Sequence, residues 1–157
     1  MADLKPGDKA PVFTAETHRG GKVSLEDFKG KIIVLYFYPR AMTPGCTREA
    51  VRFNELAGEF EKCGAVILGV STDPPERNKR FAEKLGVTSV VFLSDPEGEI
   101  AGMYGVLKKG TKKPSAQRVT FILDKDLVIR AVLKNVRPAE RHADEALKIV
   151  KELCSES

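Results

Sequence analysis

The stretch that decides the fold is residues 31–50, KIIVLYFYPRAMTPGCTREA, in which an apolar run leads through a proline-containing loop to a cysteine. The run from 31 to 38 is continuous, β-branched and aromatic, a pattern typical of a central strand covered on both faces. Pro39 ends that strand, and Pro44 suits the first turn of a helix, where no backbone N–H is needed. One of only three cysteines in the chain, Cys46, therefore lies at the start of a predicted helix.

The predicted helix spans residues 44–62, since its apolar residues follow helical spacing and Gly64 provides a stop signal. Cys46 precedes Ala50 by four residues and Phe53 by seven, so it shares the apolar face of that helix. The thiol is therefore expected to point into the fold from the first helical turn.

The remaining apolar patterns predict alternating strands and helices. They comprise an N-terminal hairpin with strands at 12–17 and 22–25, strands at 65–71 and 89–93, helices at 75–85 and about 96–104, a second hairpin with strands at 118–123 and 127–133, and a last helix at 138–153. Because strands and helices alternate through the middle of the chain, neighbouring strands there should be parallel and joined by right-handed crossovers. The sequence predicts a single α/β domain over residues 1–157, with a central mixed β-sheet flanked by helices on both sides.

The composition is that of a globular protein, with 42% hydrophobic and 31% charged residues among 157. The net charge of +4 is spread along the chain, which disfavours binding to nucleic acid. The longest apolar run, 32–38, is too short to span a bilayer and the first residues lack an apolar leader, so we expect a cytoplasmic protein without membrane contact. An odd number of cysteines then favours reduced or reactive thiols over a disulfide framework.

The usual signatures of a bound metal or nucleotide are missing from the sequence. His18 and His142 have no partners at metal-ligand spacing, there is no Cys-x-x-Cys, and no glycine-rich phosphate loop precedes a Lys-Ser or Lys-Thr pair. We therefore expect no metal and no bound cofactor.

The position of Cys46 suits an activated thiol. The thiolate is the reactive form of cysteine, and a first helical turn favours an anion through its unpaired N–H groups and the helix dipole. Lowering a thiol pKa from about 8.5 to about 6 takes roughly 3.4 kcal/mol, whereas the dipole supplies about 0.3 to 1 kcal/mol at an exposed site. A nearby cation is therefore required for activation, and a buried core cysteine is the alternative interpretation.

Three arginines are candidates for that cation. Arg48 lies two residues along the helix and points away from the thiol, Arg40 lies in the preceding loop, and Arg118 begins an apolar strand. Only tertiary pairing could bring Arg118 close, so spacing alone leaves Arg40 and Arg118 open. Thr43, three residues before Cys46, has a hydroxyl that can donate to a bound oxygen or cap the helix.

These residues carry a resemblance to a known family. Pro39-x-x-x-Thr43-x-x-Cys46 resembles the P-x-x-x-T-x-x-C signature of peroxiredoxins, and YFYPRAMTPGCTREA is similar to the peroxiredoxin Q, or bacterioferritin comigratory protein, subfamily. The likeness covers nearly the whole chain, through GDKAPVFT, GAVILGVSTDP, LSDPEGEIAGMYGV and QRVTFILDKD. It implies a thioredoxin-like fold and a thiol-dependent peroxidase that reduces hydrogen peroxide and organic hydroperoxides.

The resemblance also implies roles for individual residues. It assigns Cys46 as the peroxidatic cysteine, whose thiolate attacks the peroxide and becomes a sulfenic acid. It assigns Thr43 and Arg118 as the activating partners of that thiolate and Pro39 as a shield of the pocket. Glu49 matches the C-T-x-E pattern of the subfamily and either orients the arginines or is a solvated glutamate of the first turn.

The sequence departs from the subfamily where a resolving thiol is expected. Many members have a resolving cysteine five residues after the peroxidatic one, where this chain has Val51, and the predicted helix at 75–85 contains none either. Cys63 continues an apolar stripe and is expected to pack into the core, about 25 Å along the helix from Cys46. Cys154, near the C-terminal end, is the better resolving candidate, within one chain or across a homodimer.

The alternative to a resolving cysteine is an external reductant, either a small thiol or a thioredoxin-like protein. The sequence leaves both a monomer and a homodimer open. A second function class is a thioredoxin-fold redox sensor or disulfide-exchange protein, although the missing Cys-x-x-Cys pair counts against exchange.

Overall fold

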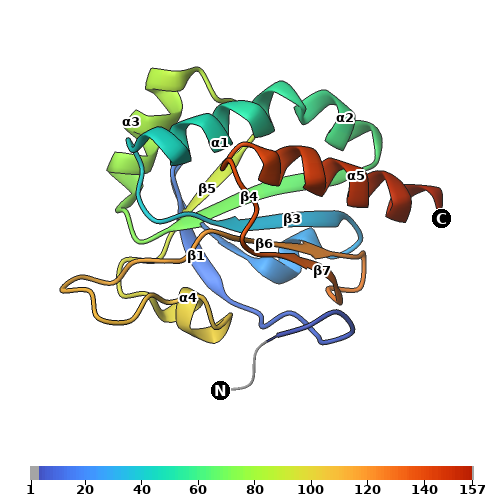
Figure 1. Cartoon of the computed structure of the whole chain (residues 1–157), viewed down its shortest axis with the longest axis horizontal. Helices are drawn as coiled ribbons and strands as arrows, with labels where there is room; N and C mark the ends of the chain where they lie inside the picture. Colours follow the sequence, from blue (N-terminus) through green and yellow to red (C-terminus); the bar gives the residue numbers. More distant parts are fainter. Residues whose placement is uncertain (1–3, 157) are drawn as a thin grey trace.

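The computed structural model describes residues 4–156, which form a seven-stranded mixed sheet with helices on both faces (Figure 1). The strands are β1 (Thr14–Thr17), β2 (Lys22–Ser24), β3 (Ile32–Phe37), β4 (Ala65–Ser71), β5 (Val91–Ser94), β6 (Val119–Leu123) and β7 (Ile129–Leu133). Their order across the sheet is β2-β1-β5-β4-β3-β6-β7. β3, β4 and β5 are parallel, whereas β1, β2, β6 and β7 pair antiparallel with their neighbours. The predicted mixed sheet with an N-terminal hairpin is confirmed.

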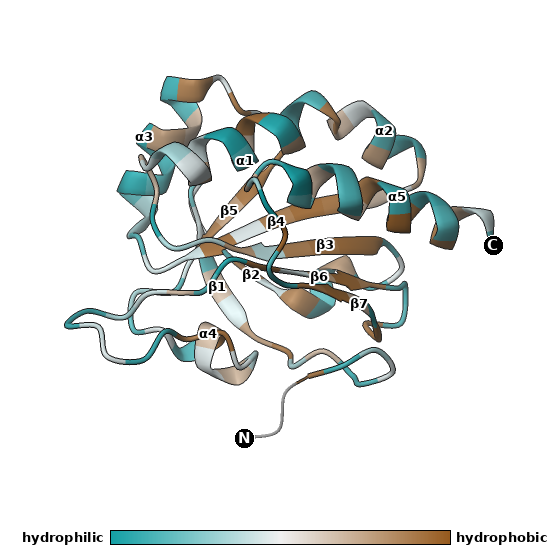
Figure 2. Cartoon of the chain, in the orientation of Figure 1, coloured by the Kyte–Doolittle hydropathy of each residue, from teal (hydrophilic) through white to brown (hydrophobic). Residues whose placement is uncertain are grey.

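β3 lies inside the sheet, between β4 and β6, and all of its residues are buried. Successive side chains of a strand point to opposite faces of the sheet. The even-numbered residues from Ile32 to Tyr36 join one apolar core, and the odd-numbered residues from Ile33 to Phe37 join the other. Figure 2 shows the apolar strands between helices whose outer surfaces are polar. Burial of both faces therefore explains the continuous apolar run.

The two faces of the sheet are covered by different helices (Figure 1). The longer helices α1 (Pro44–Glu55), α3 (Pro75–Leu85) and α5 (Arg141–Ser155), together with the short α2 (Ala57–Lys62), lie on one face. The 3-10 helix η1 (Leu25–Phe28), α4 (Glu99–Met103) and the N-terminal segment lie on the other. None of the helices within residues 4–156 is long and apolar enough to cross a membrane.

The single helix predicted at 44–62 is wrong, because the chain breaks between α1 and α2. Leu56 leaves the helical conformation with φ −92° and ψ 1°, and it caps both helices. Asn54 Oδ1 accepts the N–H groups of Thr88 and Ser89 at 3.1 and 3.0 Å, which ties the end of α1 to the loop before β5. Gly58 follows, a residue of low helix propensity. The apolar spacing continues across the break, so periodicity did not reveal it.

The short helix near residue 96 also begins later than predicted. Asp95 Oδ1 and Oδ2 accept the N–H groups of Ile100 and Ala101 at 3.0 and 2.9 Å. Gly98 has a left-handed φ of 73° and caps α4, which starts at Glu99. The residues between Asp95 and Gly98 thus form a turn that leads into the helix rather than its first turn.

α5 runs in the same direction as α1 and α2 and packs beside them. Three ion pairs join α1 and α2 to α5: Arg48 with Glu140 at 3.3 Å, Arg52 with Asp144 at 2.7 Å, and Glu59 with Lys151 at 3.7 Å. The partners are separated by the same 92 residues in each pair. A constant separation requires parallel helices in one register along the side on which α1 and α2 pack against α5.

Candidate active site

Cys46 lies in the first turn of α1, where the chain enters the helix after β3. Thr43 is the N-cap residue and Pro44 the first helical residue. Backbone N–H groups of a first turn have no partner within the helix, so they and the helix dipole favour an anion at this position. The thiol is only 1% exposed and points into the core, as predicted.

Arg118 is the arginine that contacts Cys46. It directly precedes β6, whose Val119 pairs with Phe37 of β3, so the sheet brings Arg118 to the end of β3 where the cysteine loop begins. Arg118 Nη2 donates to Cys46 Sγ at 3.4 Å. Arg48 instead pairs with Glu140 on the outer surface. Strand pairing thus brings Arg118 to Cys46, whereas Arg40, the other candidate left open by spacing, is exposed in the loop before α1.

Glu49 is fully buried, so its interpretation as a solvated first-turn residue is wrong. Its Oε1 accepts a hydrogen bond from Arg118 Nη1 at 2.5 Å. One guanidinium therefore contacts the carboxylate and the thiol through different nitrogens. Burial raises the pKa of Glu49 to about 8, although the charge and hydrogen bond of Arg118 oppose the shift. Burial alone would lower the pKa of Arg118, but the neighbouring Glu49 and Cys46 raise it.

Thr43 does not cap α1 with its side chain, contrary to one of the two roles expected for it. Its hydroxyl donates to the carbonyl oxygen of Arg40 at 2.8 Å instead. The hydroxyl proton is used inside the loop, so the oxygen lone pairs are what Thr43 presents to another group. Pro39 ends β3 on the same side, and its carbonyl oxygen accepts from Ser115 at 3.3 Å.

A surface cavity of about 530 Å³ adjoins this loop. Pro39 and Thr43 line it together with residues of the loop before β6, namely Lys108, Thr111, Lys112, Lys113 and Ser115, and with Arg40. Four basic residues, Arg40, Lys108, Lys112 and Lys113, thus lie at the approach to the cysteine loop. The approach is consequently positively charged.

The cysteine loop is held in place by a buried carboxylate. Asp73 accepts the N–H of Ala41 at 2.7 Å and pairs with Arg77 at 3.0 Å, while Arg77 Nη2 donates to the carbonyl of Ala41 at 3.3 Å. Met42, in the same loop, has a left-handed φ of 70°. Fixed hydrogen bonds on both sides of Ala41 support this turn, which aims the chain into α1.

Sequence reasoning missed three residues around Arg118. A Cβ on Gly45 would lie 3.0 Å from Arg118 Nη2, so glycine gives the guanidinium room to approach α1. Thr120 Oγ1 and His142 Nδ1 are 2.9 Å apart behind the site, and both residues are buried. Burial and the charge of Arg118 lower the pKa of His142 to about 4, so the ring is neutral at pH 7. Only the position of Gly45 beside Cys46 offered a sequence signal.

The structure does not bring the other two cysteines to Cys46. Cys63 ends α2 and packs against the core, as predicted, whereas Cys154 lies in the last turn of α5. Both lie at the end of the parallel helices opposite to Cys46. The neighbouring Cys154 thiol, together with burial, raises the pKa of Cys63.

Comparison with known proteins shows the family to which this fold belongs. The model of the AhpC/TSA family matches residues 6–132. Peroxiredoxin Bcp of Escherichia coli K12 is 37% identical over 156 residues, covering 97% of this chain and 99% of the relative. The chloroplastic peroxiredoxin Q of Sedum lineare is 38% identical over 155 residues, covering 98% and 81%.

Solved structures have the same fold. Peroxidoxin BcpB of Mycobacterium tuberculosis superposes with a TM-score of 0.89 at 35% identity, covering 96% of this chain and 98% of the other. Peroxiredoxin Q of Xanthomonas campestris gives a TM-score of 0.84 at 30% identity, covering 98% of both. The thioredoxin-like fold, together with these peroxiredoxin relatives, defines the class of protein as a thiol-dependent peroxidase. The chain belongs to the AhpC/TSA family of peroxiredoxins, and its predicted likeness to the peroxiredoxin Q and Bcp group is confirmed.

Proposed function

We propose that Cys46 is the peroxidatic cysteine and that Arg118 is the cation that stabilises its thiolate. The contact of 3.4 Å between Arg118 Nη2 and Cys46 Sγ carries this proposal. Two unit charges at that distance attract by about 5 kcal/mol at an effective dielectric of 20. This attraction exceeds the roughly 3.4 kcal/mol required to activate a thiol, most of which the helix dipole alone does not supply.

In the proposed reaction the Cys46 thiolate attacks the terminal oxygen of the hydroperoxide. The new S–O bond forms as the O–O bond breaks, which leaves a sulfenic acid on the protein and an alkoxide or hydroxide that takes up a proton. Negative charge moves from sulfur to the leaving oxygen, so a cation beside the sulfur stabilises the charge as it moves. Peroxide is the oxidant and a thiol supplies the electrons that return the sulfenic acid to the thiol.

We assign the neighbouring residues positioning roles. Glu49 binds one nitrogen of Arg118 and thereby directs the other toward the sulfur. The hydroxyl of Thr43 donates its proton to the backbone carbonyl oxygen of Arg40, so its oxygen can accept a hydrogen bond from the O–H of the hydroperoxide. Pro39, at the end of β3, shields the site from water.

The proposed reductant is an external thiol, either a small molecule or a thioredoxin-like protein. Cys46 lies at the start of α1, whereas Cys63 and Cys154 lie at the far ends of α2 and α5. This placement supports the proposal, since a disulfide requires Cα atoms within about 7 Å. Resolution by Cys154 of a second subunit is the alternative. We further propose that residues 1–157 act as one domain in the cytoplasm, where thiol reductants are abundant, as a monomer or a homodimer.

Two measurements test these proposals. Cys46→Ser should abolish peroxide consumption with any thiol reductant, and turnover retained by that variant would overturn the assignment. Mass spectrometry of wild type and Cys154→Ser after one equivalent of peroxide should find sulfenic acid on Cys46 in both. A disulfide between Cys46 and Cys154, lost in the variant, would show that the chain resolves itself.

The distance of Cys46 from both other thiols also favours redox sensing as a second candidate function, because its sulfenic acid would persist without external thiol. Slow peroxide reduction with a persistent mixed disulfide would support this role. Rapid turnover with a thioredoxin-like reductant would exclude it.

A further inference from the structure

Cys63 and Cys154 occupy neighbouring positions at one end of the parallel helices. The ion pairs between α1 or α2 and α5 join residues that are 92 apart in the sequence, and the last of them is Glu59 with Lys151. Cys63 follows Glu59 by four residues, or about one helical turn, and Cys154 follows Lys151 by three. Continuing the register pairs position 63 with position 155, so Cys154 lies one residue from exact register with Cys63, at the same end of the packed helices.

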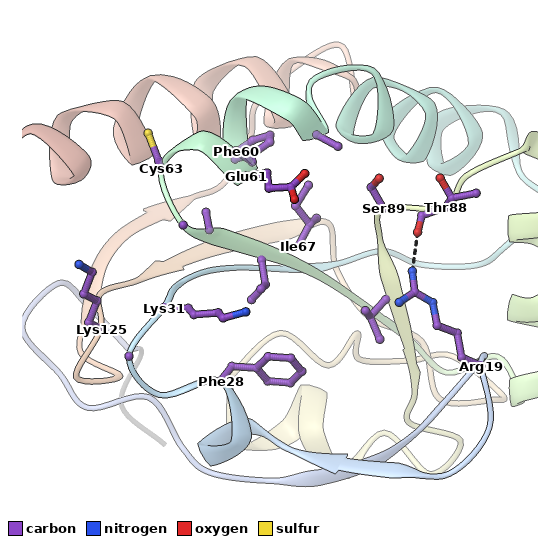
Figure 3. Close-up of a pocket in the computed structure, with 16 residues that line it drawn as sticks. Arg19, Phe28, Lys31, Phe60, Glu61, Cys63, Ile67, Thr88, Ser89 and Lys125 are labelled. Atoms are coloured by element: carbon purple, nitrogen blue, oxygen red, sulfur yellow. Dashed lines mark hydrogen bonds between the residues drawn. The ribbon is translucent and has the colours of Figure 1, made fainter.

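The side chain of Cys63 is directed at α5 rather than into the cavity beneath it. A cavity of about 520 Å³ lies under α2 and is lined by Cys63, Phe60 and Glu61 among others. Figure 3 shows the sulfur of Cys63 pointing away from this cavity, toward the ribbon of α5. The effect of the Cys154 thiol on the pKa of Cys63 agrees with this direction. The neighbour toward which the Cys63 sulfur points is therefore α5, and not the cavity.

Both cysteines lie where the backbone can adjust. Cys63 is the C-cap residue of α2, and Cys154 is the second-last residue of α5. Helix ends fray and shift at little cost, so movements of the two ends can bring the neighbouring sulfurs to bonding distance. Each residue is partly exposed, which lets a small oxidant reach the pair.

We propose that Cys63 and Cys154 form a reversible intrachain disulfide that joins the end of α2 to the end of α5, independently of Cys46. The oxidant is a low-molecular-weight disulfide. The thiolate of one cysteine attacks it, forming a mixed disulfide and releasing one small thiolate. The second cysteine, after losing its proton, attacks the protein sulfur of the mixed disulfide and releases the other. Two protein thiols are oxidised, one small disulfide is reduced to two thiols, and two protons pass to these products or to the solvent.

The expected consequence is a more stable oxidised form. The disulfide closes a loop of about 90 residues, which restricts the unfolded chain. For a domain of this size, such a loop corresponds to a rise in melting temperature on the order of 10 °C. The raised pKa of Cys63 makes its thiolate scarce at pH 7, so the pair should oxidise slowly.

The experiment uses the whole chain carrying Cys46→Ser, which removes the reactive thiol. The protein is incubated with oxidised or reduced glutathione, digested without reduction and mapped by mass spectrometry, and its melting temperature is measured. We expect a crosslinked peptide containing Cys63 and Cys154, the loss of two hydrogen atoms in the intact monomer, and the higher melting temperature only after oxidation.

The matched control adds Cys63→Ser to the same protein and should show neither the crosslink nor the shift. With Cys46 intact, Cys63→Ser should leave peroxide consumption unchanged. The proposal is overturned if both cysteines of the oxidised protein remain open to alkylation, if they carry only glutathione, or if Cys154 links two chains. These results do not depend on peroxidase activity, so this proposal and the proposed function can fail separately.

Discussion

Replacement of Arg118 by methionine tests the central contact of the site. Methionine keeps much of the length and apolar stem of arginine but removes the guanidinium that lies 3.4 Å from Cys46 Sγ. The attraction between unit charges at this distance is about 5 kcal/mol at an effective dielectric of 20 and about 1 kcal/mol at that of water. The side chain of Arg118 is 22% exposed, so the loss should lie between these limits.

A loss of about 3 to 4 kcal/mol corresponds to a decrease of roughly 10²- to 10³-fold in kcat/KM. Arg118→Lys should fall between wild type and Arg118→Met. It keeps the charge but cannot contact Glu49 and Cys46 through two nitrogens of one rigid group. The matched control is Arg48→Met, because Arg48 is close to Cys46 in sequence but pairs with Glu140 at the surface. That variant should retain wild-type activity.

The assay measures the second-order rate of sulfenic acid formation by rapid quenching and mass spectrometry, since the chain has no tryptophan to report oxidation by fluorescence. Urea unfolding checks that the variants remain folded, because removing Arg118 leaves the buried Glu49 without its partner. A rate for folded Arg118→Met within threefold of wild type would refute the electrostatic role. An equal loss in Arg48→Met would show that general charge, and not this contact, governs the rate.

Three further predictions concern residues around Arg118. The pKa of Glu49 is about 8 in the folded protein and 4.5 in the unfolded chain, so the free energy of unfolding should fall as pH rises between these values. Glu49→Gln should remove this pH-dependent loss, which amounts to up to about 5 kcal/mol, as measured by urea unfolding. His142 is the reverse case, since its folded pKa is lowered from 6.5 to about 4; stability should fall as pH drops through this window, and His142→Gln should remove up to about 3 kcal/mol of that loss. Gly45→Ala should displace the Arg118 guanidinium and lower kcat/KM roughly tenfold, whereas Gly58→Ala, with no atom within 4 Å of its added Cβ, should leave activity unchanged and stabilise α2 by about 1 kcal/mol. Flat pH profiles in wild type, or equal activities of the two alanine variants, would contradict these expectations.

The strands and most helices could be predicted because each carries its own pattern. The apolar run at 31–38 predicts a strand that is buried on both faces, and the spacing of Cys46, Ala50 and Phe53 predicts a helix with one apolar face. The break at Leu56 could not be predicted in this way, because it depends on Asn54 binding to a loop that lies more than 30 residues away in the sequence. Local periodicity reports which face is buried, not what the ends of a helix contact.

The partner of Cys46 depended on tertiary structure. Arg118 reaches the site only through the pairing of β6 with β3. Sequence spacing therefore could not choose between Arg40 and Arg118 as the cation beside Cys46, and only the family resemblance favoured Arg118. Glu49 could have been placed from the sequence, because it lies three residues after Cys46 on the same helix face. Its burial was missed because charged residues rarely point into a core unless they are paired, and its partner was unknown.

The first turn of α1 is held less firmly than the rest of that helix, and this difference bears on how Cys46 is recycled. Its sulfur is 1% exposed, so a reductant must wait for the first turn of α1 to open. That turn has no side-chain cap, since the hydroxyl of Thr43 bonds to Arg40, and a missing cap forgoes about 1 kcal/mol of helix stability. Further along, Phe53 is fully buried in the core. Backbone amides near residues 47–49 should therefore exchange hydrogen at least tenfold faster than those near Phe53, by mass spectrometry or NMR. Equal protection would place the opening elsewhere, and the reductant would then need a route to the sulfur that leaves α1 intact.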